Sequence, residues 1–327
     1  MKIKCPECGK VYNINQNKLP EKPIIKIRCK SCNQPFSFKN IYIKNDIDER
    51  PKIKKEDFLK NTGALPPVPE ILIKAREIVN DDKSSAKDLA VILEKDQAMA
   101  SRILKIANSA YYSLRTTVNS VQQACILLGS ETLLQMITLA TTSKMLAKEL
   151  KGYSISSGEV FIHSTGVGFA AQSIAERSVP SLKADAFSAG ILHDAGKLII
   201  DNYLFEHKET FVPLISSGLP NYLAEREILG FDHSEIGHDF LKSWNIPANQ
   251  CCAIKWHHEP LKSDENQLAY ILHTANALVL LMEDMPTEQI NIDDKVMDFL
   301  GLDFETLDEI RQNTKKAIQE IFIGFIS

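Results

Sequence analysis

The stretch Ile191-Leu192-His193-Asp194-Ala195-Gly196-Lys197-Leu198-Ile199-Ile200 places an imidazole beside a carboxylate in otherwise apolar sequence. Its pattern predicts the buried end of a helix, followed by a small-residue gap and a lysine. Adjacent helical residues point about 100° apart, so His193 and Asp194 meet at one point only through an object that lies off that turn. A divalent metal ion is such an object. The alternative is a buried His–Asp hydrogen bond that joins two helices.

The composition favours a helical protein of two or three domains. The chain has 327 residues, 44% hydrophobic and 24% charged, with 14 glycines and 14 prolines. This is enough for a substantial core, and it disfavours a turn-rich β protein. We find no charged-then-apolar leader and no run of about 18 apolar residues, and we therefore expect a cytoplasmic protein without membrane contact.

Four of the seven cysteines form two C-x-x-C pairs in the first 40 residues. Cys5 and Cys8 make one pair and Cys29 and Cys32 the other, a spacing that predicts a tetrahedral all-cysteine zinc site. Few apolar side chains accompany them, so we expect a small β ribbon in which zinc is structural. The remaining cysteines are interpreted as small buried residues, and these are Cys125, Cys251 and Cys252.

The cysteine-rich segment is basic, whereas the rest of the chain is acidic. Residues 1–40 hold nine Lys/Arg and two Glu, a balance of +7, and the whole chain carries −4, which leaves −11 for the remainder. One interpretation is a surface that contacts nucleic acid or an acidic partner. The other is that the lysines offset the negative charge of four thiolates on one zinc ion.

A known family carries the same arrangement as this segment. The shared positions are Cys5, Pro6, Cys8, Tyr12, Ile14, Leu19, Pro20, Ile27, Arg28, Cys29, Cys32 and Phe36. On these residues the segment resembles the short four-cysteine finger found at the N-terminus of many bacterial proteins.

A helical array follows a charged stretch that contains Pro51. Residues 41–62 show no sustained apolar period and are predicted to be a linker. Helical periodicity then begins near Leu65. Ser85 and Asp88 predict one helix start, and Gly129 is predicted to end a helix that Ser120 precedes. Nothing in this array indicates a strand.

Several linked motifs in this array resemble one family. They are Leu65-Pro66-x-Val68-Pro69, Glu94-Lys95-Asp96-Gln97-Ala98, Ile103-Leu104-x-x-Ala107-Asn108-Ser109-Ala110-Tyr111 and Ala124-x-x-Leu127-Leu128-Gly129. From about residue 62 to 275 the chain is similar to the HDOD domain, an all-helical relative of the HD phosphohydrolases found in bacterial signalling and regulatory proteins. The expected fold class is therefore all-α, an HD-domain-like helical bundle preceded by a small β zinc ribbon. We expect a ribbon over 1–40, a linker over 41–62, an HDOD domain over 63–282 and a C-terminal helical extension over 283–327.

Histidines recur in the apolar helical segments of this region. A single histidine on an apolar helix is more often a satisfied core residue, but several of them together with Asp194 suit iron, manganese or zinc in an open site. The resemblance to the HD superfamily implies a candidate ligand set of His163, His193, Asp194, His233, His257 and His258. The superfamily's last aspartate falls at Asn276, whose amide is a weak and uncharged ligand.

Two further features bear on activity. No Gly-Tyr-Pro loop follows His258, so the resemblance does not imply a cyclic dinucleotide phosphodiesterase. Lys197 matches a phosphate-contacting lysine of the relatives, and its alternative interpretation is a helix C-terminal lysine. If the protein is an enzyme, Asp194 and Lys197 are the candidate catalytic residues.

The leading hypothesis is a signal-transduction or regulatory protein that works without catalysis by binding a protein partner, with the finger as a recognition element. One alternative is a metal-dependent phosphohydrolase acting on a nucleotide or another phosphoester. The other is a nucleic-acid-binding regulator that acts through the finger. The expected cofactors are zinc in the finger, and iron or manganese at the histidine cluster.

Overall fold

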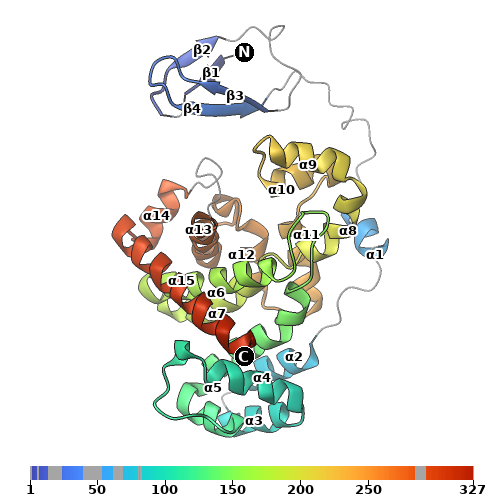
Figure 1. Ribbon diagram of the computed structural model, residues 1–327, viewed down its shortest axis with the longest axis vertical. Coiled ribbons are helices and arrows are strands. Elements are labelled where there is room, and N and C mark those ends of the chain that lie inside the picture. Colours follow the sequence, from blue (N-terminus) through green and yellow to red (C-terminus); the bar gives the residue numbers. More distant parts are fainter. Residues whose placement is uncertain are drawn as a thin grey trace.

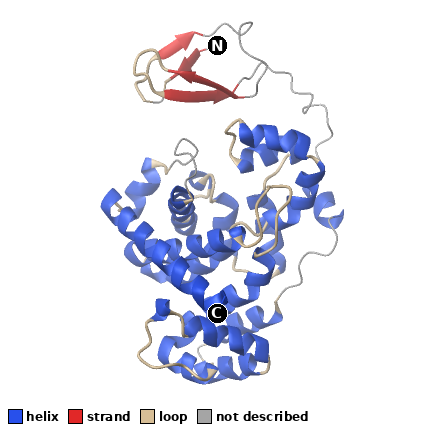
Figure 2. Ribbon diagram, in the orientation of Figure 1, coloured by secondary structure: helices blue, strands red, loops and turns tan. Residues whose placement is uncertain are grey.

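The computed structural model is a helical protein with a small β portion near its N-terminus (Figures 1 and 2). It describes residues 2–5, 7–13, 24–39, 54–61, 69–79, 81, 83–283 and 292–326. The predicted fold class, all-α preceded by a β ribbon, is confirmed. Predicted finger positions Pro6, Ile14, Leu19 and Pro20 lie outside the described residues.

The ribbon consists of two antiparallel hairpins. Strand β1 (Lys2–Lys4) pairs with β2 (Val11–Asn13), and β3 (Ile24–Arg28) pairs with β4 (Pro35–Lys39). Each C-x-x-C pair occupies the turn of one hairpin. In the first turn the Gly9 backbone N–H donates to the Cys5 carbonyl, and in the second the Asn33 backbone N–H donates to the Cys29 carbonyl. Buried Phe36 packs against these cysteines, so the ribbon has a core of its own.

The first helical region begins earlier than the sequence predicted. Residues 55–61, expected to be part of a linker, form α1 (Lys55–Asn61). The Phe58 side chain is 4% exposed and packs edge-on against Phe231 and Tyr203, which fixes α1 on the helical domain. The sequence shows no sustained apolar period here, and the buried large side chain among those described in this helix is Phe58. The helices that follow are α2 (Glu70–Val79), α3 (Ala86–Glu94), α4 (Gln97–Ala107), η2 (Ala110–Tyr112) and α5 (Val121–Leu146).

The predicted start and stop signals in this region are confirmed. The Asp88 carboxylate accepts the backbone N–H of Ser85 at 2.8 Å, and the Ser120 hydroxyl caps α5. Gly129 has φ +80° and breaks α5 into two helical segments. Because that left-handed conformation costs an L-residue free energy, glycine is the residue that allows the break.

Helix α5 is long and apolar on average. By length and composition it is the one described helix able to cross a membrane, and half of its most apolar window is buried inside the protein. The helix contains no unbroken apolar run of that length, because Gln, Ser, Glu and Thr residues interrupt it, and its mean hydropathy over an 18-residue window is what meets the criterion. A core helix passes the same test.

The second helical region carries most of the histidines. It comprises α6 (Glu159–Ser178), η3 (Pro180–Leu182), α7 (Lys183–Leu192), α8 (Lys197–Glu206), α9 (Lys208–Ser216), α10 (Asn221–Leu229), α11 (His233–Ser243), α12 (Ala248–Trp256), η4 (Pro260–Lys262), α13 (Gln267–Met282), α14 (Asp294–Leu300) and α15 (Phe304–Ile326). Helix α15 packs along α6 and also contacts α4 (Figure 1).

Two close backbone approaches position the functional side chains. Helices α6 and α7 cross where a Cβ on Gly190 would lie 2.6 Å from the Gly168 Cα. The turn between α7 and α8 meets α11, where a Cβ on Gly196 would lie 1.9 Å from the His233 carbonyl oxygen. Only glycine leaves room for these contacts, so the His193–Asp194 dipeptide is pressed against the start of α11.

Candidate metal centre

The structure brings all six predicted histidine-cluster residues together at one point. His163 lies in α6, His193 and Asp194 directly follow α7, and His233 begins α11. His257 and His258 follow α12. The ligand atoms fall into two groups of three, and within each group they lie within 4.8 Å of one another. One group is His163, His193 and Asp194, and the other is His233, His257 and His258. The Asp194 Oδ1 and His233 Nε2 atoms join the two groups at 3.2 Å.

Four of the imidazoles share one orientation, which their Nδ1 contacts fix. The Nδ1 atom of His193 bonds to the Gly190 carbonyl at 2.8 Å, and that of His257 bonds to the Ile254 carbonyl at 2.7 Å. The Nδ1 atoms of two others bond to carboxylates, His163 to Glu283 at 2.9 Å and His233 to Glu225 at 2.7 Å. Since a carbonyl or carboxylate accepts, each Nδ1 carries the proton and each Nε2 faces the centre.

Buried polar atoms with no protein partner gather at the same point. The Nε2 atoms of His193 and His257 and the Oδ1 atom of Asn276 are buried and have no hydrogen-bond partner within the protein. A buried polar atom without a partner costs free energy. Imidazole nitrogens and one carboxylate are the donor set of a transition-metal ion, so these residues fit a metal of that class.

Burial keeps three of the imidazoles neutral. It lowers the pKa of His193 to about 3, and it holds the pKa of His257 and of His258 well below the ordinary value, with neighbouring histidines adding to the shift at the latter two. A neutral imidazole is the form that binds metal. The centre therefore presents most of its nitrogens ready for coordination at neutral pH.

His233 and Asp194 are charged instead. Burial opposes the charge on His233, but Glu225 and Asp194 outweigh it and raise the pKa of His233 to about 9. Burial also opposes ionisation of Asp194, but His193, Lys197 and His233 hold the pKa of that carboxyl well below its usual range. The His233 Nε2 atom lies 3.2 Å from the Asp194 Oδ1 and 3.0 Å from the His258 Nε2, so a metal ion bound here would take the place of the Nε2 proton.

Glu225 was not predicted from the sequence. Its carboxylate is fully buried in α10 and accepts hydrogen bonds from the His233 backbone N–H, the His233 Nδ1 and the Tyr153 hydroxyl, the last at 2.8 Å. A carboxylate that orients a ligating histidine is a recurrent second layer of metal sites. The signal available was an acidic residue on the apolar face of a helix, eight positions before His233.

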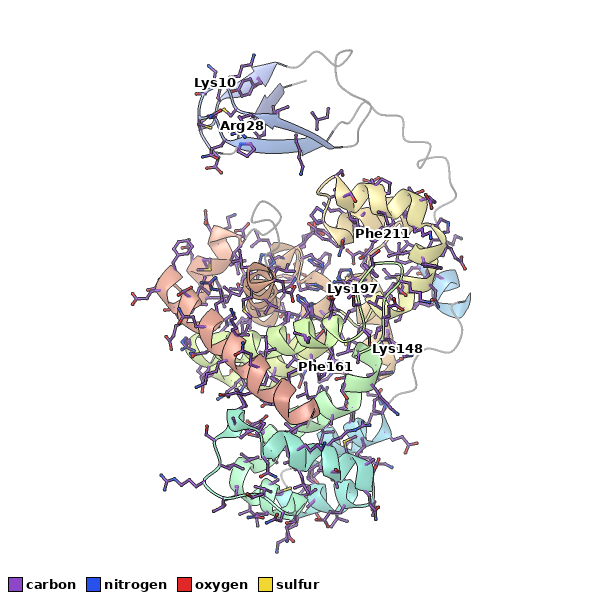
Figure 3. The ribbon with its side chains drawn as sticks, viewed as in Figure 1. Lys10, Arg28, Lys148, Phe161, Lys197 and Phe211 are labelled. Atoms are coloured by element: carbon purple, nitrogen blue, oxygen red, sulfur yellow. The ribbon has the colours of Figure 1, made fainter. Side chains whose placement is uncertain are left out.

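Lys197, labelled in Figure 3, is half-buried beside Asp194. Its Nζ is 2.6 Å from the Asp194 Oδ2 and 5.8 Å from the centre of the Tyr153 ring. Lys197 is the first residue of α8. The interpretation as a lysine at a helix C-terminus is therefore wrong, because the helix restarts immediately after Gly196.

Two other residues lie beside the centre. His273 bonds through Nδ1 to the His257 carbonyl at 2.8 Å, so it supports the backbone of a cluster residue. Asn276 lies on α13 and lines the same cavity as His163 and Asp194. Of the cysteines outside the ribbon, Cys125 and Cys251 are buried as predicted, whereas Cys252 is half-buried.

A cavity of about 560 Å³ opens over the centre. Its walls include His163, Asp194, Lys197, His233 and His258, together with apolar side chains of α6 and α13. A cavity of this size suits a small ligand next to the histidine cluster.

The ribbon cysteines form a second cluster with a different chemistry. Their ligand atoms lie within 4.8 Å of one another, as predicted for Cys5, Cys8, Cys29 and Cys32. The Tyr12 hydroxyl lies 3.0 Å from the Cys29 Sγ. Burial opposes ionisation of that thiol, but the Tyr12 hydroxyl and backbone N–H groups outweigh it and lower the pKa of Cys29 to about 6. The cluster supports zinc binding.

Comparison with known proteins decides the family. Residues 65–260 match the HDOD domain family, and residues 1–37 match a zinc-ribbon domain family. The chain belongs to the HDOD domain family. An uncharacterized protein of Treponema pallidum (strain Nichols) is 20% identical over 234 residues, which are 69% of this chain and 44% of that protein. The chain thus spans less than half the length of this relative.

Solved structures share the HDOD fold. The crystal structure of an HDOD domain protein of unknown function from Geobacter sulfurreducens has a TM-score of 0.70 at 24% identity, covering 82% of this chain and 97% of that one. A Shewanella amazonensis SB2B protein named as a candidate phosphohydrolase has a TM-score of 0.63 at 23% identity, covering 82% and 96%. A Marinobacter aquaeolei VT8 protein named as a candidate signal transduction protein has a TM-score of 0.64 at 22% identity, covering 85% and 62%.

Proposed function

We propose that this chain is a signal-transduction protein whose HDOD domain binds divalent transition metal at the histidine centre and, beside it, a phosphorylated small molecule. The main support for this proposal is the shared orientation of the imidazoles. Four Nδ1 atoms bond to carbonyl or carboxylate groups around the centre, which leaves their Nε2 atoms facing it. The ligand set is mostly neutral, so bound iron or manganese would keep much of its positive charge and attract an anion.

The side chains around the centre have distinct roles in this proposal. Glu225 and Glu283 hold the rings of His233 and His163 in place. Lys197 orients the Asp194 carboxylate and reaches the cavity, where its ammonium group can contact a phosphoryl oxygen. When bound, the metal supplies Lewis acidity toward that oxygen.

We propose binding without turnover because the cavity offers no evident general base. Among the described lining residues, Glu283 is engaged with His163, and Glu159 is exposed and accepts the Ser156 backbone N–H. Asn276 supplies an uncharged amide where related metal sites have a carboxylate. The second candidate function is metal-dependent phosphoester hydrolysis, and the Asp194 carboxylate between the two histidine groups favours it.

We propose that the ribbon recognises a partner, in first place a protein. Its described surface exposes several basic side chains, of which Lys10 and Arg28 are labelled in Figure 3. Nucleic acid is the competing partner. Salt-dependent binding to an oligonucleotide that disappears in Cys29→Ser would favour it, and salt-independent or absent binding would favour a protein partner.

The test of the main proposal uses the full-length chain loaded with Mn²⁺ and titrated calorimetrically with inorganic phosphate. We expect phosphate binding that requires the metal and is lost in Asp194→Asn. No phosphate binding by the metal-loaded chain would overturn the proposal. Metal-dependent turnover of 4-nitrophenyl phosphate that Asp194→Asn abolishes would replace it with the hydrolase.

A further inference from the structure

We infer that the ligand of the histidine centre carries one phosphoryl group on an apolar body that is not a nucleoside. This inference rests on the proposed function and narrows its ligand class. The evidence for it is the charges, the aromatic contacts and the apolar surface of the side chains that line the cavities around the centre.

Two adjoining cavities surround the centre. Besides the cavity of about 560 Å³, a second of about 340 Å³ lies between α10, η4 and α13. The two share the lining residues Pro220, Tyr222, His258, Asn276 and Leu280. A ligand anchored beside Asp194 therefore extends along these shared walls, and their chemistry selects its body.

The charges of the walls leave room for one phosphoryl group. The two lysines that line the described cavities are already paired, Lys197 with Asp194 at 2.6 Å and Lys262 with Glu259 at 2.6 Å. Further lining carboxylates belong to Glu159, Glu283 and Asp293. A second phosphate, away from the metal, would lie near these carboxylates with no unpaired cation to offset the repulsion between the negative charges. Such an arrangement costs free energy.

Among the described residues, the walls offer little aromatic surface for a nucleobase. Proteins commonly hold bases by stacking them on aromatic rings. Apart from histidines, the aromatic residue that lines the described cavities is Tyr222. Its ring already stacks on His258, with ring centroids 4.3 Å apart and planes inclined by 8°, and the Arg226 guanidinium lies 5.3 Å from its centre. One face of the Tyr222 ring is therefore already covered by His258.

An apolar surface remains for the body of the ligand. The side chains of Ile155, Val160, Ile162 and Leu280 line the cavity over the centre. Of these, Ile155, Ile162 and Leu280 are half-buried, so each retains surface that a ligand can cover. Covering apolar surface favours an alkyl or similar body, by about a fourfold gain in affinity for each methylene buried.

The test is a calorimetric series on the full-length, Mn²⁺-loaded chain with inorganic phosphate, methyl phosphate, butyl phosphate, hexyl phosphate, adenosine monophosphate and adenosine bisphosphate. Affinity should rise along the alkyl series, with hexyl phosphate at least about tenfold tighter than methyl phosphate. The two adenosine ligands should bind no tighter than methyl phosphate. Tighter binding of either adenosine ligand than of hexyl phosphate, or a flat alkyl series, would overturn the inference.

Variants test whether the preference for longer alkyl phosphates comes from the cavity wall. Leu280→Glu, or the milder Leu280→Thr if the first folds poorly, should reduce the ratio of hexyl to methyl phosphate affinity by about tenfold. Val212→Glu, a matched change on α9 outside the cavities, should keep the ratio. An unchanged ratio in both Leu280 variants contradicts the inference. Inorganic phosphate separates the two claims, because its failure to bind the wild-type chain defeats the proposed function itself.

Discussion

The ribbon and the histidine centre are both candidate metal sites, but they are built in opposite ways. In the ribbon the four cysteines lie in two hairpin turns, and the buried core beside them is small. In the helical domain the ligands come from several helices whose core is already packed. We therefore expect metal to create the fold of the ribbon, whereas the fold of the helical domain creates its metal centre.

The largest effect expected from this difference concerns Cys29→Ser. Without a complete thiolate set the ribbon should lose its zinc and unfold outright, since zinc binding supplies its folding free energy. The helical domain should be unaffected. NMR amide dispersion of residues 2–39 and the far-UV circular dichroism of the chain measure the two parts. Cys252→Ser, at a half-buried cysteine outside the ribbon, is the control, and a ribbon still folded in Cys29→Ser would break the comparison.

The pH dependence of metal binding should be steep at the histidine centre. The pKa of His233 is raised to about 9, so this ring holds a proton that a metal ion must displace. Below that pKa, affinity should rise about tenfold per pH unit, and it should level off above it. Competition with a metal chelator between about pH 7 and pH 9 measures this. An affinity that stays constant over the interval would show that His233 is not a ligand.

Glu225→Gln should weaken metal binding without disturbing the ribbon. The amide cannot reproduce the carboxylate that orients His233, and loss of such a partner lowers metal affinity by about 10- to 100-fold. Glu209→Gln, at an exposed glutamate on α9, is the matched control. Isothermal titration with Mn²⁺ gives the affinity, and zinc content verifies the ribbon. Equal Mn²⁺ affinity in both variants would show that Glu225 does not support metal binding at the histidine centre.

The smallest effect should follow from Tyr12→Phe. This change deletes the hydroxyl that donates to the Cys29 Sγ and leaves all four thiolates in place. Zinc affinity should fall by about threefold to tenfold, the net scale of one ordinary hydrogen bond in water, with the ribbon still folded. Chelator competition monitored by zinc release provides the measurement. A loss as complete as that of Cys29→Ser would show that Tyr12 supports the fold itself.

The sequence predicts the ribbon and the fold class well because their signals are local. C-x-x-C spacing, the Ser85 and Asp88 start signal and the Gly129 break act over a few residues, and the structure contains each of them. The linker prediction missed α1, because one buried aromatic ring, Phe58, holds it through tertiary contacts.

The histidine centre could be predicted only in part. Its six residues follow from the resemblance, and the structure brings them together. The contacts that orient them are absent from any short pattern, because Glu225 meets Tyr153 and His233 only through the packing of α10. Likewise, the pairing of Lys197 with Asp194 depends on where α8 begins, which the glycine contact with α11 sets.

The central claim is that the histidine cluster is a metal centre of its own, apart from the ribbon. Elemental analysis of the full-length Cys5→Ser/Cys29→Ser chain, purified without chelator, tests it most directly. The account predicts that this chain keeps at least one iron or manganese ion although its ribbon zinc is gone. A chain of that composition that folds normally in its helical domain and holds no transition metal would contradict the account.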